Sequence, residues 1–95
     1  MPHCSIALKV DDLESVESTI KTFAVEQYKA NSAYHLDGGM WNIDAGENDV
    51  RAIVREENSI IKFFCRYRTD VSKTEARISD FANTHSKECT AIHTQ

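Results

Sequence analysis

The first residues of the chain alternate between apolar and polar side chains. Apolar residues occupy every second position from Cys4 to Val10. A period of two is typical of a strand with one face on the core. The segment therefore predicts an opening strand, and its core-facing residues are Cys4, Ile6, Leu8 and Val10.

The spacing then changes to a helical period. Asp11 is suited to cap a first turn, and Glu14, three residues later, fits both a capping box and the positive end of the helix dipole. We therefore predict a helix that begins after Asp11 and ends near Tyr28. Its buried face consists of Leu13, Val16, Ile20, Phe23, Ala24 and Gln27.

The Gly-Gly pair at 38–39 is the strongest local signal, because glycine adopts the positive φ angles of a two-residue hairpin turn. Such a turn pairs Leu36 with Trp41 and Tyr34 with Ile43, which puts these four residues on one face. Turn chemistry and hydrophobic pattern thus predict the same register.

A second hairpin is predicted with its tip at residues 57–58. The pairs that face the core are then Val54 with Ile61, Ala52 with Phe63, and Val50 with Cys65. The opposite face collects the candidate site residues of the chain, five of them cationic. These residues are Arg51, Ile53, Arg55, Ile60, Lys62, Phe64, Arg66 and Arg68.

A second helix is predicted after residue 69. Ser72 followed three residues later by Glu75 is another capping-box signal. The apolar side of this helix, which should end by about Ser86, consists of Ala76, Ile78, Phe81, Ala82 and His85. The last segment, residues 87–95 with Cys89 to His93 at its centre, is either an edge strand or a loose tail.

These segments predict a single α+β domain that spans residues 1–95. The expected architecture is a two-layer sandwich, with a mainly antiparallel sheet of four or five strands and two helices on one face. The expected order is β-α-β-β-β-β-α with an optional final strand. The other face of the sheet would expose Ile53, Ile60 and Phe64 among arginines.

Composition restricts the class further. A chain of 95 residues with 41% hydrophobic and 27% charged residues is typical of a globular domain and excludes a disordered tail. No apolar stretch approaches the roughly 20 residues that span a bilayer, and no signal-peptide pattern begins the chain. Three cysteines without a C-x-x-C pair indicate thiols in a reducing interior. We therefore expect a cytoplasmic protein without membrane contact.

The exposed face has three interpretations. It is a solvated face with Arg and Lys stems lying over apolar groups, a homodimer interface, or an anion site. The anion is a small molecule or a nucleic acid, whose phosphate and base Arg, Phe64 and Tyr67 could bind. The missing RNP-like aromatic pattern and the net charge of −4 count against the nucleic acid.

Candidate catalytic residues are few. Cys4 and Cys65 occupy core-facing positions of their predicted strands, where burial makes a thiol inert. The acidic pair Asp11-Asp12 is explained by helix capping. No P-loop, GxGxxG, HExxH, GxSxG or zinc spacing occurs. The isolated histidines, which form no metal pair, are His3, His35 and His85. We expect a non-enzymatic protein without metal or cofactor.

Several segments together resemble a known family. They are the opening strand, Phe23-Ala-Val-Glu-Gln, Asp37-Gly-Gly-Met-Trp-Asn-Ile, Arg51-Ala-Ile-Val-Arg-Glu-Glu and the last helix. Over Cys4 to His85 they are similar to an uncharacterised bacterial family of short α+β domains, found alone or attached to siderophore-interacting flavoproteins. The first helix departs from this family, since it lacks a His-Trp-like end. The resemblance implies the fold and a link to iron physiology, and it implies no catalytic residues.

The sequence thus favours a non-enzymatic interaction domain that acts through its exposed sheet face, as a homodimer or as a binder or inhibitor of another protein. The alternative is a small-ligand domain for an anionic metabolite or iron chelate. Its ligand would be held by Arg51, Arg55, Lys62, Arg66 and Arg68.

Overall fold

The computed structural model of the chain describes residues 2–30, 33–44, 50–55 and 59–94. In chain order its helices and strands are β1 (Ile6–Val10), α1 (Val16–Tyr28), β2 (Tyr34–Leu36), β3 (Met40–Asp44), β4 (Val50–Arg55), β5 (Ile60–Phe64), α2 (Val71–Thr84) and β6 (Cys89–His93). Short 3₁₀ turns precede both helices and connect β2 to β3.

The described strands form one antiparallel sheet of six strands in the order β2-β3-β4-β5-β1-β6. The predicted α+β class is confirmed, and the predicted count of four or five strands is wrong. Residues 89–93 form an edge strand, which pairs with β1 along its whole length. Without the hairpin β2–β3, the elements follow the β-α-β-β-α-β order of a split β-α-β arrangement.

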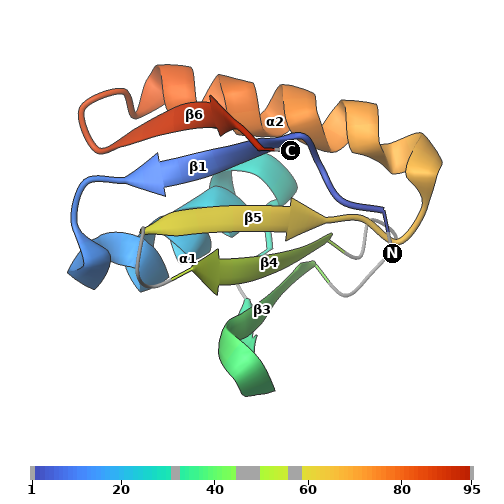
Figure 1. Ribbon diagram of the computed structural model, residues 1–95, viewed down its shortest axis with the longest axis horizontal. Helices are drawn as coiled ribbons and strands as arrows, with labels where there is room; N and C mark the ends of the chain where they lie inside the picture. Colours follow the sequence, from blue (N-terminus) through green and yellow to red (C-terminus); the bar gives the residue numbers. More distant parts are fainter. Residues whose placement is uncertain (1, 31–32, 45–49, 56–58, 95) are drawn as a thin grey trace.

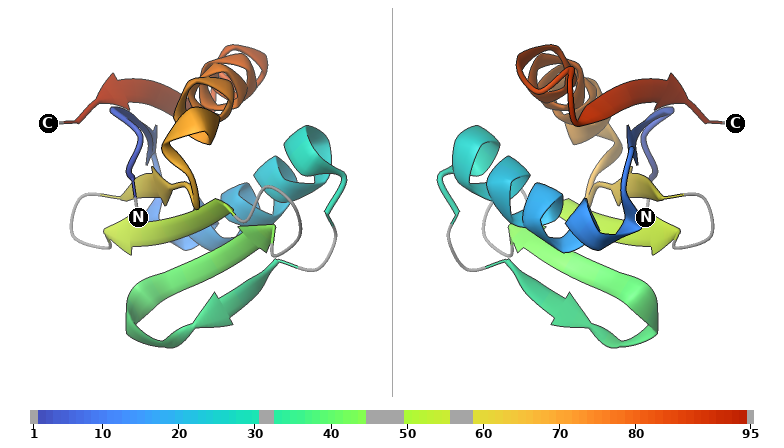
Figure 2. Two further views of the ribbon diagram at one scale, coloured as in Figure 1. Left: turned by 90° about the vertical axis from the view of Figure 1, so that its right-hand side faces the viewer. Right: turned by 90° about the vertical axis from the view of Figure 1, so that its left-hand side faces the viewer.

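Both helices cover the same face of the sheet. Figure 1 looks onto the strands with the helices behind them, and Figure 2 shows α1 and α2 together on one side. Between the layers, the Phe23 ring of α1 lies 4.9 Å from the Phe63 ring of β5 and 5.3 Å from the Phe81 ring of α2. All three phenylalanines are buried. The core therefore lies on this side, and no described helix covers the other side.

The cap of the first helix lies one residue later than predicted. The carboxylate of Asp12, not of Asp11, accepts a hydrogen bond from the Glu14 backbone N–H at 3.0 Å. A 3₁₀ turn begins at Leu13, and α1 begins only at Val16. Since a 3₁₀ turn has about three residues rather than 3.6, the change of phase leaves Leu13, a predicted core residue, 50% exposed.

The start of α2 also differs from the predicted capping box. The helix begins one residue before Ser72, and no side-chain cap occurs there. Glu75 instead accepts hydrogen bonds from the backbone N–H and the hydroxyl of Ser5, at 2.6 and 2.7 Å. On the inner side of α2, Thr74 is buried, whereas Ala76, a predicted core residue, is exposed. The carboxylate therefore joins α2 to the start of β1 rather than capping its own helix.

The predicted register of the second hairpin is confirmed where it is described. Val54 lies opposite Ile61, and Ala52 lies opposite Phe63. The predicted tip at residues 57–58 lies outside the described residues. In this register the core-facing residues of both strands recur at every second position and share one face of the sheet.

The register of the first hairpin differs by one residue. His35 lies opposite Trp41, and Leu36 lies opposite Met40, where the sequence predicted Leu36 opposite Trp41. The loop has three residues, and Gly38 and Gly39 both adopt positive φ, 76° and 74°. Such angles are compatible with two- and three-residue loops. Since β2 is a short edge strand, no second neighbouring strand determines its register.

This shift exchanges the two faces of β2. Tyr34 now shares a face with Asn42, whose side-chain amide donates to the Tyr34 hydroxyl at 3.2 Å. Leu36 likewise moves to the helix-free side, and His35 moves to the helix side beside Trp41.

Candidate functional site

The strand pairing brings five of the eight predicted site residues together on the helix-free side of the sheet. Arg51 lies opposite Phe64, and Ile53 lies opposite Lys62. Ile60 pairs through its backbone with Arg55, whose side chain lies outside the described part of the structure.

The two remaining predicted residues do not share this face. Arg66 and Arg68 are exposed in the connection between β5 and α2. The Arg66 guanidinium lies 5.7 Å from the centre of the Tyr67 ring. The alternation that the sequence suggested as far as Arg68 ends at Phe64, because the chain bends at residues 66 and 67.

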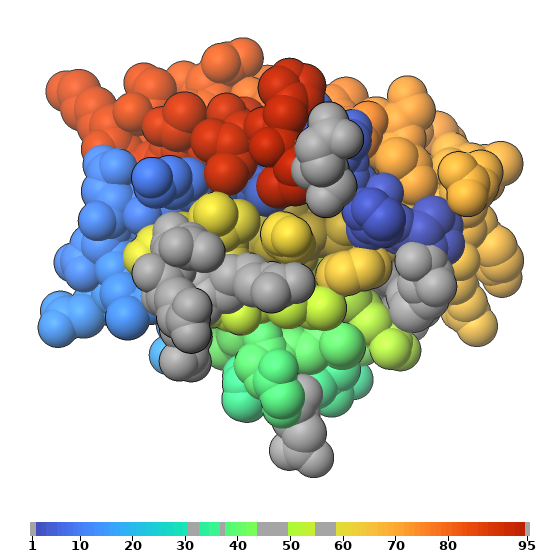
Figure 3. All heavy atoms as spheres, in the orientation of Figure 1, coloured from blue at the N-terminus to red at the C-terminus, as the bar shows by residue number. Residues whose placement is uncertain are grey.

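Neighbouring strands extend the same surface, which we call the outer face. Lys9 lies opposite Ile60, and Met40 lies opposite Ile53. Figure 3 looks onto this side of the sheet. The described side chains that strand pairing places on the outer face, of which Ala7 and Asn42 are buried, are His3, Ala7, Lys9, Tyr34, Leu36, Met40, Asn42, Arg51, Ile53, Ile60, Lys62, Phe64, Thr90 and Ile92. None of these side chains is a carboxylate, although the chain contains 15 Asp and Glu residues. The outer face therefore combines apolar and cationic groups on an acidic protein.

The outer face has a small hollow. A cavity of about 210 Å³ is lined by Met40, Arg51, Ile53 and Phe64. The His3 ring packs edge-on against Phe64, with ring centres 6.0 Å apart. Ile53 and Phe64 are half-buried, whereas the sequence predicted that both would be exposed. The hollow thus presents the edges of apolar side chains beside one guanidinium.

The thiols lie inside the core. Cys4 and Cys65 are buried, as predicted, and their sulfur atoms are 3.9 Å apart. The Cys65 thiol donates to the Thr74 hydroxyl at 3.2 Å. Burial, and to a smaller extent the neighbouring Cys65, raises the pKa of Cys4 far above its ordinary value. A protonated, enclosed thiol is a poor nucleophile and a poor metal ligand.

His85 and His35 each contact an aromatic side chain, and His85 also contacts a carboxylate. His85 Nε2 lies 2.8 Å from Glu26 Oε1, and its ring is tilted against Phe81 with centres 4.3 Å apart. The His35 ring packs edge-on against Trp41, 5.3 Å between centres. Across the described residues, no three His, Cys, Asp or Glu side chains lie close enough to hold a metal ion.

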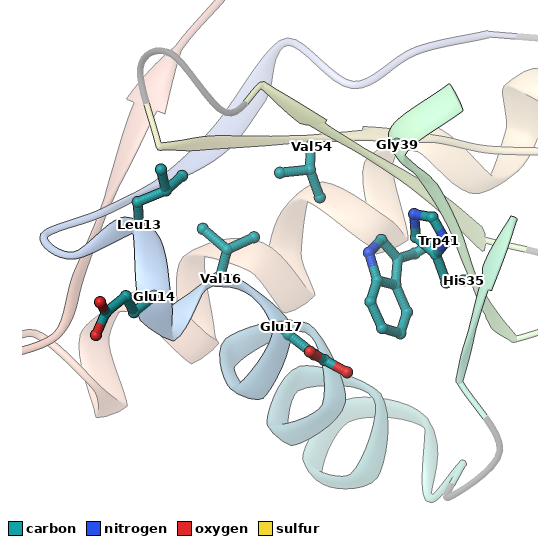
Figure 4. Close-up of a pocket in the computed structure, with 8 residues that line it drawn as sticks. All are labelled: Leu13, Glu14, Val16, Glu17, His35, Gly39, Trp41 and Val54. Carbon is teal, nitrogen blue, oxygen red and sulfur yellow. The ribbon is translucent and has the colours of Figure 1, made fainter. Parts of the chain in front are cut away.

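A larger cavity lies on the helix side, between the start of α1 and the β2–β3 hairpin (Figure 4). Its volume is about 490 Å³, and it is lined by Leu13, Glu14, Val16, Glu17, His35, Gly39, Trp41 and Val54. The predicted register placed Leu36, not His35, beside Trp41, so the sequence did not indicate this cavity. One feature of the sequence could have indicated the cavity: Leu13 is apolar and stands at the first position of the helical period.

Comparison with protein-family models, with curated proteins and with solved structures finds no match to this chain. The resemblance to the family associated with siderophore-interacting flavoproteins therefore stays a prediction. Neither α1 nor α2, the two α-helices among the described residues, is long and apolar enough to cross a membrane.

Proposed function

We propose that this protein is a non-enzymatic binding domain, and that its outer face binds an acidic surface of another protein. One observation carries this proposal: the helix-free side of the sheet combines apolar and cationic side chains without a described carboxylate. Arginine and aromatic residues are enriched at protein interfaces, whereas Asp and Glu are depleted there.

Charge favours an acidic partner over a second copy of the chain. In a two-fold dimer the same patch faces itself, so Lys9 and Lys62 would meet the same cations of the partner copy. Like charges brought together at an interface are strongly unfavourable. An acidic partner would instead neutralise them, while Phe64 and the hollow beside it receive an apolar side chain as an anchor.

The proposal is tested with a labelled peptide of alternating glutamate and leucine as the probe. Lys62→Glu should weaken binding at least about tenfold, because it places a like charge against the peptide. Lys73→Glu changes the net charge equally on the exposed side of α2 and is the matched control, expected to bind like the wild type. Equal loss in both variants would overturn the proposal, since the attraction would then depend only on net charge.

Solution mass and a nucleic-acid probe separate the competing interpretations. A wild-type mass of one chain supports binding of a different partner, whereas a doubled mass that Lys62→Glu halves overturns it in favour of a homodimer. Binding of a single-stranded oligonucleotide more tightly than the acidic peptide would also overturn it.

An anionic small molecule is the second candidate, because Arg51 lines the hollow of the outer face. Citrate serves as the probe, and its effect on the melting temperature is the readout. A rise in melting temperature that Arg51→Gln abolishes and Arg66→Gln retains would favour this small-ligand function over protein binding.

A further inference from the structure

The cavity between α1 and the β2–β3 hairpin is a separate surface from the outer face. Its volume of about 490 Å³ lies in the range of small-molecule sites. Figure 4 shows the first turns of the helix on one side, Trp41 and His35 on the other, and Val54 of β4 closing a third side.

One part of this cavity is apolar. Leu13, Val16 and Val54 point into it from neighbouring elements (Figure 4). Leu13, in the 3₁₀ turn that precedes α1, is 50% exposed. A ligand group placed here would remove the Leu13 side chain from water, which is favourable.

One of the molecule's own cations lies beside the other part of the cavity, where it contacts two of the lining residues. Lys21 Nζ lies 5.9 Å from the centre of the Trp41 ring and 3.1 Å from Glu17 Oε1. Trp41 and Glu17 both line the cavity, and the Glu17 carboxylate points toward the indole in Figure 4. An aromatic face attracts a cation, and the carboxylate adds an opposite charge. Lys21 thus marks a position that suits an ammonium group.

Lys21 is replaceable at this position. The side chains of Lys21 and Glu17 are 56% and 63% exposed, and exposed ion pairs contribute little to stability. An ammonium group from outside can take the place of Lys21 while the lysine turns to solvent.

We propose that this cavity binds a small organic cation, a primary ammonium joined to an apolar or aromatic group. The apolar group lies against Leu13 and Val54, and the ammonium lies between Trp41 and Glu17 in the place of Lys21. This site does not depend on the outer face or on its partner.

The first test uses three probes of similar size: phenethylammonium, 2-phenylethanol and phenylacetate. Trp41 is the only tryptophan of the chain, so its fluorescence reports binding directly. Phenethylammonium should bind several-fold more tightly than the alcohol, and phenylacetate should bind least. Equal binding of the ammonium and the alcohol would overturn the cation site.

The second test uses two exposed residues. Glu17→Gln should weaken phenethylammonium binding by about threefold, because it removes the carboxylate partner. Lys21→Ala should strengthen binding by about threefold, because it removes the lysine that competes with the ligand's ammonium group. Glu88→Gln and Lys73→Ala make the same charge changes at exposed positions that do not line the cavity, and they should leave binding unchanged.

The Lys21→Ala result is decisive. Unchanged or weaker binding in that variant would overturn the inference, since Lys21 would then not occupy the ligand's position. A phenylalanyl-lysine dipeptide with blocked ends carries the same ring and ammonium on a peptide. If this dipeptide binds more tightly than phenethylammonium, the cation that the cavity binds is a peptide side chain. If it binds more weakly, that cation is a free amine.

Discussion

Two adjacent phenylalanines of β5 lie in opposite environments. Phe63 is 1% exposed and packs against Phe23 of α1, with ring centres 4.9 Å apart. Phe64 is half-buried on the outer face, where the His3 ring meets it edge-on and a hollow opens beside it. The residue type is the same and the strand is the same. The helix layer therefore decides which of the two lies in the core and which stays on the outer face.

Removing the two rings should separate the faces most clearly. Phe63→Ala should lower the free energy of unfolding by about 3 to 5 kcal/mol, because it leaves a cavity in the core. Phe64→Ala should lower it by only about 1 kcal/mol, since its ring is half-buried. Urea unfolding measures both values. Equal losses would mean that the outer face is as tightly packed as the core.

Substitution of Trp41 tests whether the core between the helices and the sheet extends to the β2–β3 hairpin. Trp41 is 8% exposed, so Trp41→Ala should lower the free energy of unfolding by about 3 kcal/mol. Tyr67→Ala, at an exposed aromatic residue, is the control with little expected loss. The emission of wild-type Trp41 should lie at shorter wavelength than that of the unfolded chain. Emission at the fully hydrated limit would contradict its burial.

A charge at Phe64 should affect binding more than folding. Phe64→Asp should lower the free energy of unfolding by about 1 to 2 kcal/mol and abolish binding of the acidic peptide, because a carboxylate then faces the partner. Phe64→Leu keeps an apolar anchor and should retain most of the binding. The mass in solution should equal that of the wild type, and a drop from two chains to one would identify the outer face as a homodimer interface.

The smallest expected effect is alkaline destabilisation through the groups on the helix side. Burial raises the pKa of Cys4 and of Cys89 above 9.0 and the pKa of Tyr28 above 10.0. Above these ordinary values the unfolded chain releases protons that the folded chain keeps, so the free energy of unfolding falls as pH rises. We expect a loss of about 1 kcal/mol per pH unit for each thiol that is ionised in the unfolded chain and still protonated in the folded one.

Urea unfolding at neutral and alkaline pH measures this slope. Cys4→Ala, which removes one of the buried thiols, should make the slope shallower although its cavity lowers stability at every pH. An equal slope in the variant would show that Cys4 does not contribute. Rapid alkylation of Cys4 or Cys65 in the folded protein would contradict their enclosure.

Segments whose core-facing residues recur at every second position were predictable from the sequence. The β4–β5 register, the burial of Cys4 and Cys65, and the outward position of Phe64 all follow from a period of two on paired strands. The end of α1 at Tyr28 follows from the end of its apolar period. In each case the signal lies within a few neighbouring residues, so local periodicity is sufficient.

Positions that depend on distant partners were not predictable. The Glu75 carboxylate accepts hydrogen bonds from Ser5, which lies far away in the chain. No local sequence pattern distinguishes that contact from a capping box. The chain turns away after β5, which separates Arg66 and Arg68 from the strand face.

By itself, the sequence determined that a strand, a helix, two hairpins and a second helix form a two-layer α+β domain, and that β4 and β5 present arginine and phenylalanine on one side. Only the tertiary structure decided the register of β2, which brings His35 beside Trp41 and forms the cavity next to Leu13. The reason is physical. Glycine at 38 and 39 permits more than one loop length, and an edge strand takes its register from contacts with the rest of the fold.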